Sequence, residues 1–213
     1  MKKQFTVLFL GLAVSLVAAG HASAASVILP RAGQVGIGVI GNFGTLLDSG
    51  QLGGEFGSGF GLGIRLRYRM RYERAIGLSF DQHYLDSRVL GYPKGAFSDQ
   101  KDPLTDSLLT RDQLVMTTTG FDYYQMFSTR TRNVKWISGS VGLVQVSAKL
   151  SDGETQYPDG GDGTYLGAGA GWERFVYRTW ALDFEARYQA IFYGSTVNHN
   201  LQASAGIVFY AAY

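Results

Sequence analysis

Apolar and polar side chains alternate along several stretches of the chain. In residues 58–72, SGFGLGIRLRYRMRY, apolar and aromatic side chains occupy every second position, and glycine or arginine occupies most positions between them. A period of two puts these two sets on opposite faces of a β-strand, whereas a helix would scatter both around its circumference. The same alternation returns in residues 180–193 and 200–213. We therefore predict three long strands, each with one apolar and one polar face.

Weaker alternation fills the intervals between these strands. Four further segments alternate over fewer residues, namely 35–39, 76–83, 115–124 and 166–173. The segment 134–147 is predicted to be a strand from its valine and isoleucine content, although its pattern does not assign its two faces. Together these segments predict an all-β fold of eight strands.

The connections between the predicted strands alternate in length. Long connections rich in Gly, Asp, Ser or Pro are expected at 44–57, 87–110 and 148–163, and short ones at 73–75, 128–133 and 178–179. An up-and-down antiparallel barrel produces this alternation when its two ends face different environments. The last connection on the long side, about 194–198, is short for its class. We predict one domain without a linker.

The N-terminal segment has the pattern of a secretory signal. Lys2 and Lys3 make a positive start, residues 5–19 are almost wholly apolar, and Ala22-Ser23-Ala24 supplies the small residues that a signal peptidase reads. We predict a cleaved signal peptide at 1–24 and the barrel at 25–213. Nothing after residue 25 approaches 18 consecutive apolar residues, so no later helix is expected to span a bilayer.

Composition narrows the function classes. The chain has 19 Lys+Arg, 17 Asp+Glu and no cysteine, and loss of Lys2 and Lys3 would leave it formally neutral. Without cysteine there is no disulfide framework, thiol catalysis or cysteine-based zinc site. The balanced charge also argues against a nucleic-acid partner.

The alternation is compatible with a soluble, lipocalin-like barrel or with a barrel in lipid, depending on where the apolar face points. Four features favour the barrel in lipid: the export signal, strands of about 13–15 residues, a polar face crowded with glycine and charge, and an aromatic last residue. An arginine that faces lipid near the bilayer midplane costs roughly 2–4 kcal/mol. The arginine row of residues 58–72 must therefore face the lumen.

The same parity turns acidic residues of other strands inward, where they can neutralise the arginines. Unpaired buried charge is costly, so we expect ion pairs and hydrogen bonds among these groups. The sequence predicts a salt-bridged plug and not an open aqueous pore, built from Arg65, Arg67, Arg69, Arg71, Asp81, Asp122, Glu173, Asp183, Glu185 and Arg187.

Aromatic residues gather on the apolar face near both ends of the predicted strands. This distribution is typical of the girdles that mark the two membrane–water interfaces. The residues are Tyr72, Trp172, Trp180 and Tyr213 near the short turns, and Phe60, Tyr84 and Phe192 near the long loops.

From residue 25 onward, the chain resembles the small eight-stranded outer-membrane barrels of Gram-negative bacteria, namely the OmpA-type transmembrane domain and its OmpX- and OmpW-like relatives. The resemblance rests on the architecture, the charged lumen face and the last strand, LQASAGIVFYAAY. It implies an outer-membrane location, both termini in the periplasm, long loops outside the cell, and contact with membrane lipid and lipopolysaccharide. It also implies that the assembly machinery reads the last strand, including Phe209 and Tyr213.

Some barrels of this size modify lipid A, so a site built on histidine needs consideration. His83 falls on the lumen face beside Asp81, and His199 falls on the lipid-facing parity of a strand that is not adjacent. The lipid A deacylases that resemble this fold would place a serine two residues after His199, where this chain has Leu201. We predict no catalytic residues and no cofactor.

The loop DGETQYPDGGDG offers weak candidates for a cation site. Carboxylates among glycines suit calcium or an ion that bridges to lipopolysaccharide, but the spacing matches no EF-hand loop, and Asp-Gly runs also suit hairpin tips. We assign no metal here; the candidates are Asp152, Glu154, Asp159 and Asp162.

The sequence thus favours a non-enzymatic outer-membrane barrel with a plugged lumen. Its role would lie in envelope integrity or in surface binding through the loops 44–57, 87–110 and 148–163, since loops on rigid scaffolds commonly carry function. The alternative is a narrow or gated pore for small or apolar solutes. Two features argue against it: the lumen charges and the expected absence of an apolar inner face. An enzyme that modifies lipid A is the third hypothesis.

Overall fold

The computed structural model describes residues 32–47, 50–87, 113–149, 155–156 and 161–211. Apart from one short helix, all of its regular elements are strands. In chain order they are β1 (Val35–Leu46), α2 (Gly50–Glu55), β2 (Phe56–Arg71), β3 (Arg74–Ser87), β4 (Gln113–Phe127), β5 (Asn133–Lys149), β6 (Thr155–Gln156), β7 (Asp162–Phe175), β8 (Trp180–Tyr193) and β9 (Thr196–Tyr210).

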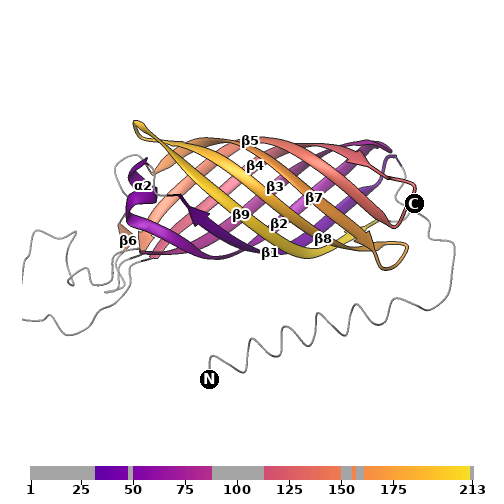
Figure 1. Cartoon of the computed structure of the whole chain (residues 1–213), viewed down its shortest axis with the longest axis horizontal. Helices are drawn as coiled ribbons and strands as arrows, with labels where there is room; N and C mark the ends of the chain where they lie inside the picture. The colour runs from indigo at the N-terminus through magenta and orange to yellow at the C-terminus, as the bar shows by residue number, and fades with distance from the viewer. Residues whose placement is uncertain (1–31, 48–49, 88–112, 150–154, 157–160, 212–213) are drawn as a thin grey trace, which may run out of the picture.

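The eight long strands close into an antiparallel barrel (Figure 1). Each long strand pairs with its neighbours in sequence, and β1 pairs with β9 to complete the circle. The predicted all-β, single-domain barrel of eight strands is therefore confirmed. Two small elements were not predicted: the two-residue strand β6, which pairs with the end of β5, and the helix α2.

Long and short connections lie at opposite ends of the barrel. The helix α2 and strand β6 mark one end, and the chain finishes β9 at the other, among the short turns (Figure 1). The expected connection 44–57 is shorter than predicted, because β1 runs to Leu46 and β2 begins at Phe56. The β8–β9 turn has only two residues, and its Gly194 adopts a φ of 58°, which glycine tolerates without strain.

The outer wall of the barrel is apolar. Phe60 and Leu62 expose 74% and 68% of their surface, and most large apolar side chains of the strands also point outward. A water-soluble barrel buries these residues and exposes charge, so this arrangement suits a barrel surrounded by lipid. Tyr213, one of the seven expected girdle aromatics, lies outside the described residues. The other six are exposed, namely Tyr72, Trp172, Trp180, Phe60, Tyr84 and Phe192.

Among the described residues, no helix is long and apolar enough to cross a membrane.

The faces of β5, which the sequence left open, are settled by its pairing with β4 and β7. Trp136 and Ser138 point into the barrel, whereas Ile137, Val141 and Leu143 point outward. Apolar residues occupy both faces of this strand, and its outward face also carries Lys135. The mixed pattern explains why alternation alone did not assign it.

Large inward side chains lie against inward glycines on neighbouring strands. The indole of Trp136 occupies the space that a Cβ at Gly171 would need, and the ring of Tyr210 lies 2.6 Å from the corresponding position at Gly36. The lumen of an eight-stranded barrel is only wide enough for side chains to fill. Each bulky residue therefore requires a strand without a side chain opposite it.

This packing predicts that Gly171→Val destabilises the barrel, because the new side chain would collide with Trp136. Overpacking of this kind costs roughly 1–3 kcal/mol. Gly139→Val is the matched control, because Gly139 faces outward with nothing within 4 Å of its Cβ position. We expect a lower urea midpoint for Gly171→Val only, measured by the mobility shift between unheated and heated protein on gels. Equal midpoints for the two variants would show that Gly171 is not tightly packed.

Candidate functional site

The lumen is filled by three layers along the barrel axis. An apolar cluster of β-strand residues closes the short-turn end, with Phe175, Val208 and Tyr210 among its members. A second apolar cluster closes the loop end and includes Leu46, Leu85, Leu114, Met116, Val144, Val146 and Ile191. The buried charged residues lie between the two clusters, as the order Ala181, Glu185, Ile191 along β8 illustrates. The expectation that the inner face has no apolar part is therefore wrong.

Helix α2 completes the apolar closure at the loop end. Leu52 of α2 is buried in the apolar cluster there, beside Phe56. The backbone N–H groups of Leu52 and Gly53 donate to the side-chain oxygen of Asn198 on β9, at 2.8 and 3.3 Å. Asn198 is fully buried, so this contact joins the helix to the barrel wall.

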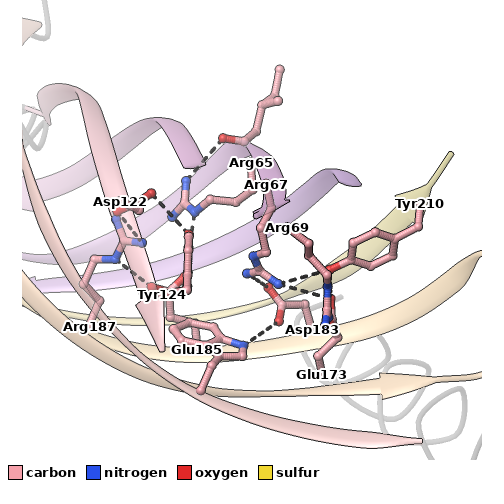
Figure 2. Close-up of polar contacts among 12 residues, drawn as sticks. Arg65, Arg67, Arg69, Asp122, Tyr124, Glu173, Asp183, Glu185, Arg187 and Tyr210 are labelled. Atoms are coloured by element: carbon pink, nitrogen blue, oxygen red, sulfur yellow. Dashed lines mark hydrogen bonds and ion pairs between the residues drawn. The ribbon is translucent and has the colours of Figure 1, made fainter. Parts of the chain in front are cut away.

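The charged layer contains two connected groups of ion pairs (Figure 2). In the group nearer the short turns, the Arg67 guanidinium contacts Glu173 at 3.1 Å and Asp183 at 3.3 Å. Arg69 contacts the other oxygen of Glu173 at 2.6 Å, and the Tyr210 hydroxyl donates to the same carboxylate. Glu173 thus accepts from three side chains that come from β2 and β9.

Aromatic rings enclose this first group. The Arg67 guanidinium lies over the ring of Tyr124, 4.4 Å from its centroid, and 5.2 Å from the Trp136 ring. The indole N–H of Trp136 donates to Asp183 at 3.4 Å. Cation–π contacts of this kind strengthen when water is excluded, so the rings stabilise the arginine as well as shielding it.

The second group lies toward the loops. Arg65 contacts Asp81 at 2.8 Å and Glu185 at 3.7 Å, and Arg187 contacts Glu185 at 2.7 Å and Asp122 at 3.2 Å. Glu185 therefore bridges two arginines that belong to opposite walls of the barrel. All five side chains of this group are almost completely buried.

Two neutral side chains extend the second group. Asn42 on β1 donates to Asp81 at 2.7 Å, and the Tyr124 hydroxyl donates to Asp122 at 3.2 Å. The carboxylate of Asp81 occupies space that a Cβ at Gly63 would need. Tyr124 also lies against Arg67, so it connects the two groups into one network, to which all eight long strands contribute a side chain.

The structure brings nine of the ten predicted lumen residues together inside the barrel; these are Arg65, Arg67, Arg69, Asp81, Asp122, Glu173, Asp183, Glu185 and Arg187. Arg71 is the exception, and its predicted inward position is wrong. The β2–β3 pairing is irregular between Arg69 and Arg71, and Arg71 ends the strand with its side chain exposed. At the strand end an arginine can reach water, so its place in the alternation no longer requires its side chain to point into the lumen.

Sequence reasoning did not assign Asn42, Trp136 and Tyr210 to the site. Asn42 lies beyond the segment 35–39 in which alternation was visible, and Trp136 lies on the strand whose faces were open. Tyr210 follows Phe209 on the inward parity of the last strand, so the signal was present there. Phe209 itself points outward, and Tyr213 lies outside the described residues.

The two histidines that the structure describes lie on opposite sides of the wall. His83 is buried in the lumen, whereas His199 faces outward and stacks on Tyr188, whose hydroxyl lies 2.5 Å from Nδ1 of His199. They belong to β3 and β9, which do not pair. The two side chains therefore share no site.

The candidate cation loop is only partly described. Asp162 is exposed at the start of β7, and the other three candidates, Asp152, Glu154 and Asp159, lie outside the described residues. Within the described part of the chain, no three His, Asp or Glu side chains are grouped so as to hold a metal ion.

Neither the protein-family models nor the curated proteins include a match to this chain. Solved structures do match. Neisserial surface protein A superposes with a TM-score of 0.58 and 17% identity, over 82% of this chain and 96% of that one. The outer membrane protein OprG from Pseudomonas aeruginosa gives 0.52 and 14%, over 88% and 100%. Ail, the attachment invasion locus protein of Yersinia pestis, gives 0.51 and 13%, over 84% and 100%. The chain thus has the fold of the small outer-membrane barrels.

The ion-pair geometry predicts that Arg67→Leu strongly destabilises the barrel. Removing one partner from a buried pair leaves an uncompensated charge and typically costs about 3–5 kcal/mol. Here Asp183 would lose its ion pair with Arg67, and Glu173 would keep only its ion pair with Arg69. Arg71→Leu is the control on the same strand, and we expect it to change the free energy of unfolding by less than about 0.5 kcal/mol.

Urea unfolding of the refolded protein in lipid vesicles measures both variants. Adding Asp183→Asn to Arg67→Leu should restore part of the loss, because the pair then disappears as a unit. If Arg67→Leu unfolds at the same urea concentration as Arg71→Leu, the buried arginine does not stabilise the barrel.

Proposed function

We propose that this protein is an integral outer-membrane protein of a Gram-negative bacterium that acts as a closed scaffold for its external loops. Its role is envelope integrity or surface binding and not catalysis. The observation that carries this proposal is the filled lumen, in which a layer of paired charges lies between two apolar clusters. The buried charged and apolar side chains of the described residues favour a lumen without a continuous aqueous path, and we therefore assign the function to the surfaces outside it.

The orientation follows the resemblance to small outer-membrane barrels. Both termini and the short turns would lie in the periplasm, and the long connections would lie outside the cell, beside lipopolysaccharide. The assembly machinery would recognise the last strand, with Phe209 and Tyr213 in its signal. The apolar outer wall supports contact with membrane lipid.

The charge of the loops indicates which ligands suit them. The connections 47–55, 88–112 and 150–161 contain nine acidic residues and four basic ones in the sequence. An acidic surface attracts cationic groups and repels anionic ones. We propose that the loops bind cationic partners; Asp152, Glu154, Asp159 and Asp162, to which we assign no metal, contribute to this negative charge.

The alternative proposal is a narrow or gated pore for small or apolar solutes. One observation favours the pore: an apolar solute would contact apolar side chains in the cluster at the loop end. Such a solute would next meet the ion pairs of Arg65 and Arg187, which it cannot replace. We therefore rank the closed scaffold first.

Single-channel recording in a planar bilayer tests the choice. We expect no discrete conductance steps from protein whose folding has been confirmed by its unheated gel mobility. A general porin, added afterwards to the same bilayer, shows that the membrane reports open channels. Reproducible steps from the folded protein would overturn the closed scaffold and establish the pore.

Sucrose octasulfate tests the charge argument for the loops. Ail has been crystallised with this heparin analogue, and it serves as the positive control. Because the loops of the present chain carry excess negative charge, we expect their few basic residues to contribute nothing to binding: Arg88→Gln with Lys94→Gln and Lys101→Gln should leave any heat measured by titration calorimetry at low ionic strength unchanged. Saturable binding that these three substitutions abolish would contradict the proposal that the loops prefer cationic partners.

A further inference from the structure

The short-turn end of the barrel carries an exposed basic collar. Three hairpins contribute to it, β2–β3, β4–β5 and β7–β8, and each supplies at least two cations. Glu73 is the one exposed acidic side chain that the described structure places at this end. The collar consists of Arg71, Arg74, Arg130, Arg132, Lys135, Arg174 and Arg178.

The collar makes the chain electrically polar along the barrel axis. From residue 26 onward the sequence contains 17 basic and 17 acidic residues and is formally neutral. The lumen accounts for four arginines and five carboxylates, which nearly cancel. The remaining charge is separated, with cations at the short-turn end and excess acid in the long connections. The chain is therefore neutral in total, although its two ends carry charge of opposite sign.

Part of the collar lies on the outer wall beside aromatic rings. Lys135 pairs in register with Phe127 on one side and Trp172 on the other, and Trp172 stacks on Phe184 with 5.4 Å between ring centroids. Arg174 is exposed two residues beyond Trp172 on the same face of β7. A lysine within an aromatic row extends its charge toward headgroups while its stem covers apolar surface.

We propose that the basic collar binds the phosphate headgroups of anionic glycerophospholipids in the leaflet at the short-turn end. Guanidinium groups match phosphate oxygens in bidentate geometry, and each surface Lys or Arg is attracted to an anionic leaflet. The inference rests on the proposed membrane location. It adds a lipid class and a set of residues that the closed-scaffold proposal does not require.

A soluble polyanion fits the collar less well than a lipid surface. Arg74, Lys135 and Arg174 extend from the outer wall of the barrel, next to the apolar surface, and not only from the turns that project beyond it. A water-soluble polymer could reach these cations on the outer wall only by entering the membrane interface beside the aromatic row. Lipid headgroups already lie at that depth, because tryptophan rings mark the interface.

Spin-labelled lipids measure the preference directly. The folded full-length barrel is reconstituted in phosphatidylcholine vesicles containing spin-labelled phosphatidylglycerol or phosphatidylcholine. The motionally restricted fraction of each label gives their relative association constant. We expect about a twofold or greater preference for phosphatidylglycerol, which falls in 0.5 M NaCl because exposed charges are screened within about 4 Å at that salt.

A triple variant and its charge-matched control identify the residues responsible. Arg74→Gln with Lys135→Gln and Arg174→Gln should lower the preference to near unity. The control, Arg88→Gln with Lys94→Gln and Lys101→Gln, removes the same charge from the 88–112 connection and should keep the preference. Unheated gel mobility confirms that both variants are folded.

Each outcome has one meaning. The collar is overturned as a lipid site if the unmodified protein shows no preference for phosphatidylglycerol. It is also overturned if that preference survives the substitution of Arg74, Lys135 and Arg174. Either result leaves the closed-scaffold proposal intact. Binding of a soluble polyanion without any lipid preference would replace the lipid with a polymer partner. Absence of any motionally restricted lipid would overturn the membrane location and the collar together.

Discussion

Every charged side chain within the apolar belt has to point into the lumen, because an arginine that faces lipid near the midplane costs roughly 2–4 kcal/mol. In this protein that constraint sends four arginines into a space only wide enough for side chains. Buried charge is tolerated when it is paired and hydrogen-bonded. The five carboxylates on strands β3, β4, β7 and β8 meet that requirement, and they tie opposite walls together through Glu173 and Glu185.

The small width of the lumen then limits which uncharged residues can lie inside it. A guanidinium, an indole and a phenol cannot share one level of the barrel unless the facing strands lack side chains. Inward glycines such as Gly36 and Gly171 supply that room. The rings they admit, Tyr210 and Trp136, donate to the same carboxylates that hold the arginines. The inward glycines, the aromatic rings and the ion pairs therefore depend on one another.

With the interior filled, the remaining chemistry of the molecule is displayed at its ends. The loop end is acidic in sequence, and the short-turn end carries the basic collar. The two ends of an outer-membrane barrel face different leaflets and compartments, so under the proposed function the opposite surface charges would suit the two ends to different partners. A rigid barrel of this kind holds the two surfaces at a fixed separation and orientation.

The sequence by itself determined the eight long strands, seven from alternation and one from its valine and isoleucine content. The cost of a lipid-facing arginine, together with the export signal and the strand length, then placed the apolar face outward. Alternation, which leaves a strand only two sides, assigned nine of the ten lumen charges correctly. It failed where that rule loses its physical basis. Arg71 lies at a strand end with an irregular register and accessible water, and β5 carries apolar residues on both faces. Only the tertiary structure decided which arginine meets which carboxylate, that Trp136 and Tyr210 join them, and that α2 seals the loop end. These contacts connect strands distant in sequence, and the closure of the sheet alone brings them within reach.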